Sequence, residues 1–87
     1  MKYTCPCCGY KTLNLKHEHD VCTICLWEDN LAQSEDPDSR GGTNKVSLKQ
    51  AQKNFIEFGA CNKNMIKFSR KPDITDIKDE NWQIEKI

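Results

Sequence analysis

Two pairs of cysteines constrain the possible folds of this chain more than any other feature of its sequence. Both pairs have the spacing Cys-x-x-Cys, thirteen residues separate them, and their members are Cys5, Cys8, Cys22 and Cys25. Such a spacing is typical of four-cysteine metal sites, although it is slightly tighter than the common version. Each turn directs two thiolates toward one point, and an intervening hairpin brings the second pair opposite the first. The sequence therefore predicts that these four residues bind a structural Zn²⁺ ion with Zn–S bonds of about 2.3 Å.

The first turn also contains two residues whose backbone preferences suit a metal-binding turn. Pro6 stiffens it, and Gly9 permits the conformation that lets backbone amides approach sulfur. Amide contacts of this kind spread the excess negative charge of four thiolates around a divalent ion. Since a closed site of four sulfur atoms leaves no position for water or substrate, the motif indicates a structural metal and argues against metal catalysis. Four thiolates do not by themselves distinguish zinc from iron, but a Cys-x-x-Cys ribbon favours zinc.

The chain is short enough to need such a site. It has 87 residues, of which 37% are hydrophobic, and a domain of this size buries only about 60 to 65% of the surface that its unfolded chain exposes. We therefore expect a single domain over residues 1–87 that depends on a metal. Thirteen basic and thirteen acidic residues cancel, which gives no electrostatic reason to expect strong binding to nucleic acid or to anionic lipid.

The sequence also bears on location. Its first residues lack the apolar stretch of a secretory signal, and no segment approaches the roughly eighteen apolar residues that a membrane span needs. We therefore expect a cytoplasmic protein without membrane contact. Thiols are kept reduced in that compartment, which favours metal ligation, although six cysteines leave a disulfide framework as the alternative.

Local patterns predict a small α+β domain in four parts. Residues 2–28 form a zinc-ribbon-like half of two β-hairpins, with the polar residues 15–20 as an exposed tip. Residues 29–45 have no helical or strand period and are expected to form a long surface loop. Residues 46–72 form a helical half. In the tail, residues 73–87, hydrophobic residues near the end suggest that it docks as a short helix followed by a strand.

The helical half is expected to contain two helices. Ser47 caps the first, Gln50 completes a capping-box pattern, and Gly59 supplies the left-handed stop. The apolar face of this helix comprises Leu48, Ala51, Phe55 and Phe58. A second helix ends at Pro72 and carries one apolar stripe, formed by Cys61, Met65 and Phe68.

Two cysteines and two histidines lie outside the predicted ligand set. Cys7 should point away from the ion as a partly buried thiol, with replacement of one ligand of its pair as the alternative. Cys61 is expected to be an inert core thiol. His17 and His19 belong to a solvated tip, or else bind zinc. A redox role for the second cysteine pair is not expected, because its flanking residues are β-prone.

Other candidate functional residues allow two interpretations each. Trp27 packs over the zinc site, or it serves as a recognition anchor on a surface shared with Glu28 and Asn44. Asn44 is expected to hydrogen-bond the preceding glycine turn. The acidic residues form a solvated loop, or bind a hard cation, although their spacing does not match a calcium loop; they are Glu28, Asp29, Glu35, Asp36 and Asp38. The basic residues of the C-terminal half are solvated, or form a nucleic-acid face; they are Lys45, Lys49, Lys53, Lys63, Lys67, Arg70 and Lys71.

Three sequence segments carry a specific combination of these motifs. They are YTCPCCGY at residues 3–10, CTICLWED at residues 22–29 and GGTNKVSLKQAQKNFIEFGAC at residues 41–61. In this order they resemble the bacterial cysteine-rich CPCC family, from residue 3 to about residue 72. The resemblance implies a small cytoplasmic bacterial protein with a zinc-ribbon-like N-terminal half and a helical C-terminal half. It implies no particular activity, and the tail lies outside the pattern.

These features together favour a zinc-stabilised protein-interaction module, whose partner is another protein. Analogy at the level of the family suggests an immunity-type or regulatory protein. The alternative is a zinc-ribbon protein that binds nucleic acid through its lysine-rich half. We expect no enzymatic activity, because the sequence contains no recognisable pair of nucleophile and base.

Overall fold

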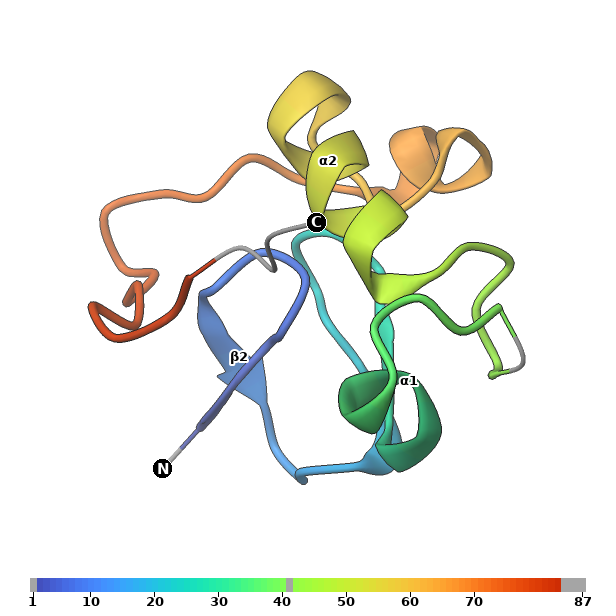
Figure 1. Ribbon diagram of the computed structural model, residues 1–87. Coiled ribbons are helices and arrows are strands. Elements are labelled where there is room, and N and C mark those ends of the chain that lie inside the picture. Colours follow the sequence, from blue (N-terminus) through green and yellow to red (C-terminus); the bar gives the residue numbers. More distant parts are fainter. Residues whose placement is uncertain (1, 41, 84–87) are drawn as a thin grey trace.

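The computed structural model describes residues 2–40 and 42–83 and begins with two antiparallel β-hairpins. Strand β1 (Tyr3–Thr4) pairs with β2 (Lys11–Leu13), and β3 (Glu18–Val21) pairs with β4 (Glu28–Asn30). Helices follow them, which confirms the predicted α+β architecture. The turns of both hairpins point toward helix α2 (Figure 1). The predicted tip at residues 15–20 is shorter than expected, because β3 begins at Glu18.

The two hairpin turns have the same backbone geometry. In the first, Cys5 N donates to Tyr10 O at 2.9 Å and Gly9 N donates to Cys5 O at 2.8 Å. In the second, the corresponding bonds run from Cys22 to Trp27 and from Leu26 to Cys22, at 2.9 and 3.0 Å. Gly9 and Leu26 therefore occupy equivalent positions, and both are left-handed, with φ of 81° and 68°. Each cysteine pair thus lies in a tight turn of one type.

The prediction of a surface loop over residues 29–45 is wrong for its first part. Strand β4 continues to Asn30, and a short helix α1 (Leu31–Glu35) follows it directly. The Asn30 side chain caps this helix by accepting from Gln33 N at 2.9 Å. Gln33 is fully buried, and its amide nitrogen donates to Ser39 O and Val46 O at 2.9 and 3.0 Å. A buried glutamine, rather than a hydrophobic period, therefore orders this segment.

Helix α2 (Leu48–Phe58) agrees with its predicted start and end, but its predicted inner face is right only in part, since Phe55 and Phe58 are half-buried and Gln52 is buried. Ser47 caps it by accepting from Gln50 N at 3.1 Å, and Gly59 ends it with φ of 83°. Leu48 and Ala51 are buried. The second half of the predicted capping box is wrong, because the Gln50 amide donates to Asn54 one turn later instead of returning to the cap.

The second predicted helix is a shorter 3₁₀-helix, η1 (Lys63–Phe68). It begins after the cap residue Asn62, whose side chain accepts from Asn64 N at 2.9 Å, and it ends before Pro72 is reached. The predicted apolar stripe is wrong in part. Cys61 is buried but precedes the helix, and 61% of Phe68 is exposed. None of the helices in residues 2–40 and 42–83 is long and apolar enough to cross a membrane.

The tail docks, as expected, but as an extended segment with turns. Lys11 N donates to Ile77 O, and Asp79 N donates to Gly9 O, both at 2.8 Å, so the tail lies along the first hairpin (Figure 1). The indole nitrogen of Trp82 donates to Pro6 O at 2.8 Å. No helix occurs in the described residues 73–83, which corrects one part of the prediction. The predicted closing strand lies outside the described residues.

Candidate metal centre

The sulfur atoms of Cys5, Cys8, Cys22 and Cys25 converge in the interior between the two hairpin turns. All four residues are fully buried, and their sulfur atoms lie within 4.8 Å of one another. Contacts cross from one turn to the other, at 3.6 Å between Cys5 and Cys25 and 3.7 Å between Cys8 and Cys22. A tetrahedron with metal–sulfur bonds of about 2.3 Å has sulfur–sulfur edges of about 3.8 Å. The cluster therefore has the size and the donor set of a tetrahedral metal site.

The protonation chemistry of these thiols also fits a cation. Burial raises the pKa of the Cys5 and Cys25 thiols well above the ordinary value. Hydrogen bonds from neighbouring thiols, with Cys25 the largest contributor, lower the pKa of Cys22 instead. Several thiolates so close together in a dry interior require a compensating positive charge. A coordinated divalent ion supplies that charge and deprotonates its thiol ligands.

Hydrogen-bond donors around the cluster are distributed unevenly. The Thr12 hydroxyl donates to Cys22 Sγ at 3.0 Å, and Ile24 N approaches the same sulfur at 3.4 Å. Thr12 comes from β2, so a strand of the first hairpin supports a cysteine of the second. Such contacts orient a ligand and draw charge from it. Sequence analysis did not single out Thr12, because nothing local to the second turn points to it.

The two remaining cysteines lie in the core beside this cluster. Cys7 is fully buried, more deeply than the partly buried position predicted, and it does not belong to the four-sulfur group. Cys61 is 1% exposed, and burial raises the pKa of its thiol to about 12, with the nearby Cys7 as the next contributor. Both environments are those of inert core thiols.

Trp27 is part of the core and not of a surface. It is fully buried in the same cluster of side chains as the cysteines, which agrees with packing over the site and excludes the recognition-anchor interpretation. Asn44 does reach Glu28, but through the backbone: Glu28 N donates to Asn44 Oδ1 at 3.0 Å, and Asn44 Nδ2 donates to Glu28 O at 2.8 Å. The Asn44 side chain therefore bonds to β4, whereas its predicted bond to the glycine turn falls partly on a residue outside the described ranges.

With this geometry established, comparison with known proteins identifies the family. The family model described as Cysteine-rich CPCC matches residues 3–76. The chain belongs to the cysteine-rich CPCC family. In this CPCC protein the matched region includes α2, η1 and the two turns of the candidate metal site, residues 5–10 and 22–27, which are called the metal-binding turns below. The match ends before Trp82, which docks on the first of these turns. A comparison with curated proteins gave no match.

The histidines and acidic residues of the CPCC protein lie away from the sulfur cluster. His19 Nδ1 lies 3.1 Å from Glu28 Oε2 in an exposed pair, and His17 N donates to Asp29 Oδ2 at 2.7 Å. Asp29 is 1% exposed, so the prediction of a wholly solvated acidic loop is wrong at this residue. Within residues 2–40 and 42–83, the four cysteines are the only group that could hold a metal ion.

Distant segments hold both metal-binding turns of the CPCC protein from outside. The Pro6 carbonyl accepts from Gln52 on α2 and from Trp82 in the tail, at 2.9 and 2.8 Å. In the second turn, Cys61 N donates to Cys25 O at 2.9 Å, and Arg70 N donates to Ile24 O at 3.2 Å. The helical half and the tail therefore depend directly on the geometry of the metal-binding turns.

Proposed function

We propose that this CPCC protein is a zinc-binding, non-enzymatic protein-interaction module of the bacterial cytoplasm, of the immunity or regulatory type. The observation that carries the proposal is the fully buried group of four cysteine sulfur atoms within 4.8 Å of one another, two of whose separations, 3.6 and 3.7 Å, match the edge of a metal–sulfur tetrahedron. Four thiolates from two Cys-x-x-Cys turns favour zinc, which binds them without redox chemistry. An ion enclosed by protein in this way stabilises the fold, and the surface of the protein remains available for recognition.

Two observations support a non-enzymatic role. The buried sulfur atoms have no solvent-exposed surface at which a substrate could approach. Outside the cysteines, the shifted pKa values of the described residues belong to surface contacts. Asp76, for example, has its pKa lowered to about 2, chiefly by hydrogen bonds from Arg70, and Asp79 has its pKa lowered by the Thr4 hydroxyl. Such pairs hold surface segments together, and structural contacts of this kind also shift pKa values.

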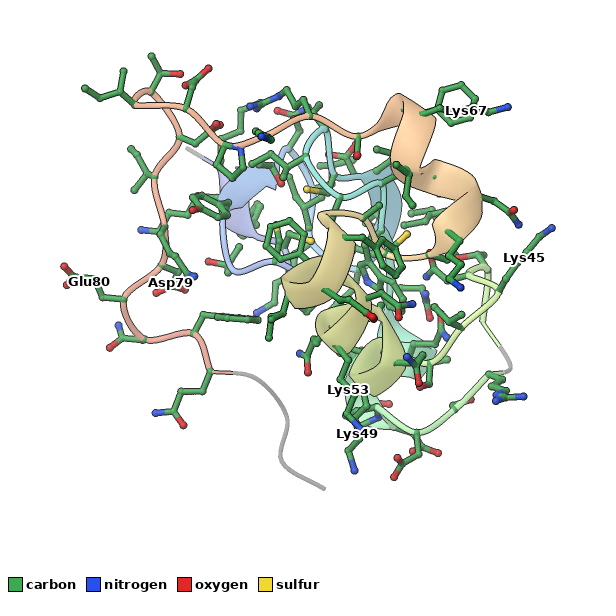
Figure 2. All side chains as sticks on the ribbon, turned by 90° about the horizontal axis from the view of Figure 1, so that it is seen from above. Lys45, Lys49, Lys53, Lys67, Asp79 and Glu80 are labelled. Atoms are coloured by element: carbon green, nitrogen blue, oxygen red, sulfur yellow. The ribbon has the colours of Figure 1, made fainter. Side chains whose placement is uncertain are left out.

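The distribution of basic residues favours a protein partner over nucleic acid. Lys49 forms an ion pair with Asp38 at 3.2 Å, and Arg70 forms one with Asp76 at 2.7 Å. Lys49 and Lys53 project from α2 in a different direction from Lys67 (Figure 2). These residues therefore do not make one continuous basic face, which is the usual footprint of a nucleic-acid backbone.

Elemental mass spectrometry of the purified chain tests the zinc site. We expect a single zinc ion per chain, lost in Cys5→Ser and Cys22→Ser together with the native circular dichroism spectrum. Cys61→Ser is the matched control, because Cys61 is buried beside the cluster without belonging to it, and it should keep its zinc. A coloured protein that contains iron, or a folded chain that contains no metal, would contradict the proposal.

Chemical cross-linking tests the protein partner. The metal-containing chain is mixed with the product of the neighbouring gene and treated with a short bifunctional cross-linker, and the products are analysed by size-exclusion chromatography with light scattering. A stable complex supports the interaction module. Absence of a complex, together with a gel shift on RNA or DNA that weakens steeply with salt, would instead favour the nucleic-acid alternative.

A further inference from the structure

Helix η1 is presented to solvent by the second metal-binding turn. The residue before its cap donates to that turn, from Cys61 N to Cys25 O at 2.9 Å. The residue after its C-cap does the same, from Arg70 N to Ile24 O at 3.2 Å. None of the η1 residues is buried. Hydrogen bonds to two adjacent carbonyl groups of the second turn, Cys25 O and Ile24 O, therefore hold the chain on both sides of η1. The side chains of η1 itself remain outside the core.

The outer side of η1 borders a groove of about 610 Å³ whose lining combines apolar and basic side chains. We call this surface the η1 patch; its residues are Lys45, Lys63, Met65, Ile66, Lys67 and Phe68. Phe68 is 61% exposed and Ile66 is 45% exposed, and both of these large apolar side chains line the same groove. Within residues 2–40 and 42–83, no acidic side chain lines the groove.

The lysines of the η1 patch are not neutralised by the rest of the molecule. Among the described residues, the ion pairs of lysine and arginine involve Lys49 and Arg70, and none involves Lys45, Lys63 or Lys67. Lys45 and Lys67 both extend into solvent on this side of the protein (Figure 2). A local excess of positive charge in a chain of zero net charge attracts an anionic partner and orients it.

We propose that the η1 patch is the partner-binding surface and that it takes an acidic protein segment in which carboxylates flank a large apolar side chain; this rests on the proposed function. Ile66 and Phe68 supply the apolar contacts of this surface and the lysines supply the charged ones, a combination that protein interfaces use. A nucleic acid fits less well. Lys67 Nζ lies 5.2 Å from the centre of the Phe68 ring, so one face already contacts a cation and is not open for a stacked base.

Peptide selection tests the chemistry of this partner. A phage library of random short peptides is selected on the full, metal-containing chain, and the enriched peptides are titrated by fluorescence anisotropy. We expect enriched sequences to place Asp or Glu on both sides of an aromatic or large aliphatic residue. Lys63→Glu combined with Lys67→Glu should weaken their binding by about tenfold, because two attractions become repulsions. Phe68→Ser should weaken it by a similar factor.

Two matched controls show whether the patch is specific. Lys53→Glu changes the same charge on the exposed side of α2, and Leu15→Ser removes an apolar side chain that is 55% exposed in the connection between β2 and β3. Both should leave the affinity within about twofold of the parent chain. Enriched peptides without acidic residues, or equal losses in the control variants, would overturn the proposal. So would tighter binding to a labelled oligouridylate than to the peptides, since that outcome assigns the patch to nucleic acid.

The partner found by cross-linking separates this inference from the proposed function. A protein that binds the parent chain and the patch variants equally well would disprove the η1 patch as the binding surface and leave the interaction module intact. A chain that binds no protein and no peptide would contradict both.

Discussion

Gly9 and Leu26 show what a single residue contributes to a metal-binding turn. They occupy the same position in the two turns and share a left-handed backbone, with φ of 81° and 68°. A leucine in this conformation costs about 1–2 kcal/mol, which its packing against the core offsets. Gly9 has a second constraint, because a Cβ atom there would lie 2.6 Å from the ring of Trp82. The tail, rather than the turn itself, makes glycine necessary at this position.

Replacement of Gly9 tests this contact. Gly9→Ala should lower the free energy of unfolding by about 2–4 kcal/mol, since it adds a clash with Trp82 to the strain of a left-handed alanine. Gly59→Ala is the matched control, because Gly59 has φ of 83° with open space around an added Cβ, and it should cost only about 1 kcal/mol. Both values come from guanidinium unfolding of the metal-containing protein.

A double-mutant cycle isolates the contribution of the clash with Trp82 to the loss of stability in Gly9→Ala. In a Trp82→Ala background, Gly9→Ala should cost no more than Gly59→Ala, because the ring that it meets is gone. An equal loss for Gly9→Ala with and without Trp82 would show that the tail does not impose the glycine.

At the scale of elements, α1 depends on one polar side chain. The Gln33 amide forms four hydrogen bonds with other parts of the chain. Its Nε2 donates to Ser39 O and Val46 O. Its Oε1 accepts from the side-chain amides of Asn30 and Asn44, at 3.0 and 2.9 Å. A Cβ atom at Gly42 would clash with the same amide oxygen. The segment between α1 and α2 is therefore folded around a buried amide with all its partners in place.

Removal of this amide should loosen the segment. Gln33→Met keeps the length of the side chain but leaves the amide nitrogens of Asn30 and Asn44 without one partner, and we expect a loss of about 2–4 kcal/mol in the free energy of unfolding. Limited proteolysis should then cut within residues 36–43. Gln50→Met is the control, because Gln50 is exposed and its side-chain amide donates to Asn54 on the same helix; it should change stability by less than about 0.5 kcal/mol. Similar effects of the two changes would contradict a role for the buried amide.

These elements also show which parts of the fold are predictable from sequence. Helix α2 has its cap Ser47, its inner face and its stop Gly59 within one short stretch, and the cysteine spacing defines both hairpin turns. Helix α1 has only the local cap Asn30, and its decisive partners lie up to thirteen residues away. The same holds for Thr12, which reaches Cys22 across the hairpins. Local signals predict elements, whereas buried polar contacts between distant residues need the fold itself.

The whole molecule has a core that is unusually poor in large apolar side chains. Among the described residues, twelve hydrophobic residues are buried; six of them are cysteines, and four of these converge in the candidate metal site. Zinc bound by small cysteine sites contributes about 10–16 kcal/mol, as much as the entire stability of a typical domain. The remaining core, built around Leu13, Ile24 and Trp27, is too small to replace that contribution.

Removal of the metal should therefore unfold the entire chain, not only its hairpins. Helix α2 has eleven residues, fewer than the roughly twelve to fifteen that an isolated helix needs for stability in water, and its Gln52 side chain is anchored to the first metal-binding turn. We expect excess EDTA to abolish the helical signal in circular dichroism and amide-exchange protection in α2 and η1 together, and zinc to restore both. EDTA already saturated with zinc is the control and should change neither. Helical signal that persists after complete metal loss would show that the helical half is held by its own packing and that the metal stabilises the hairpins alone.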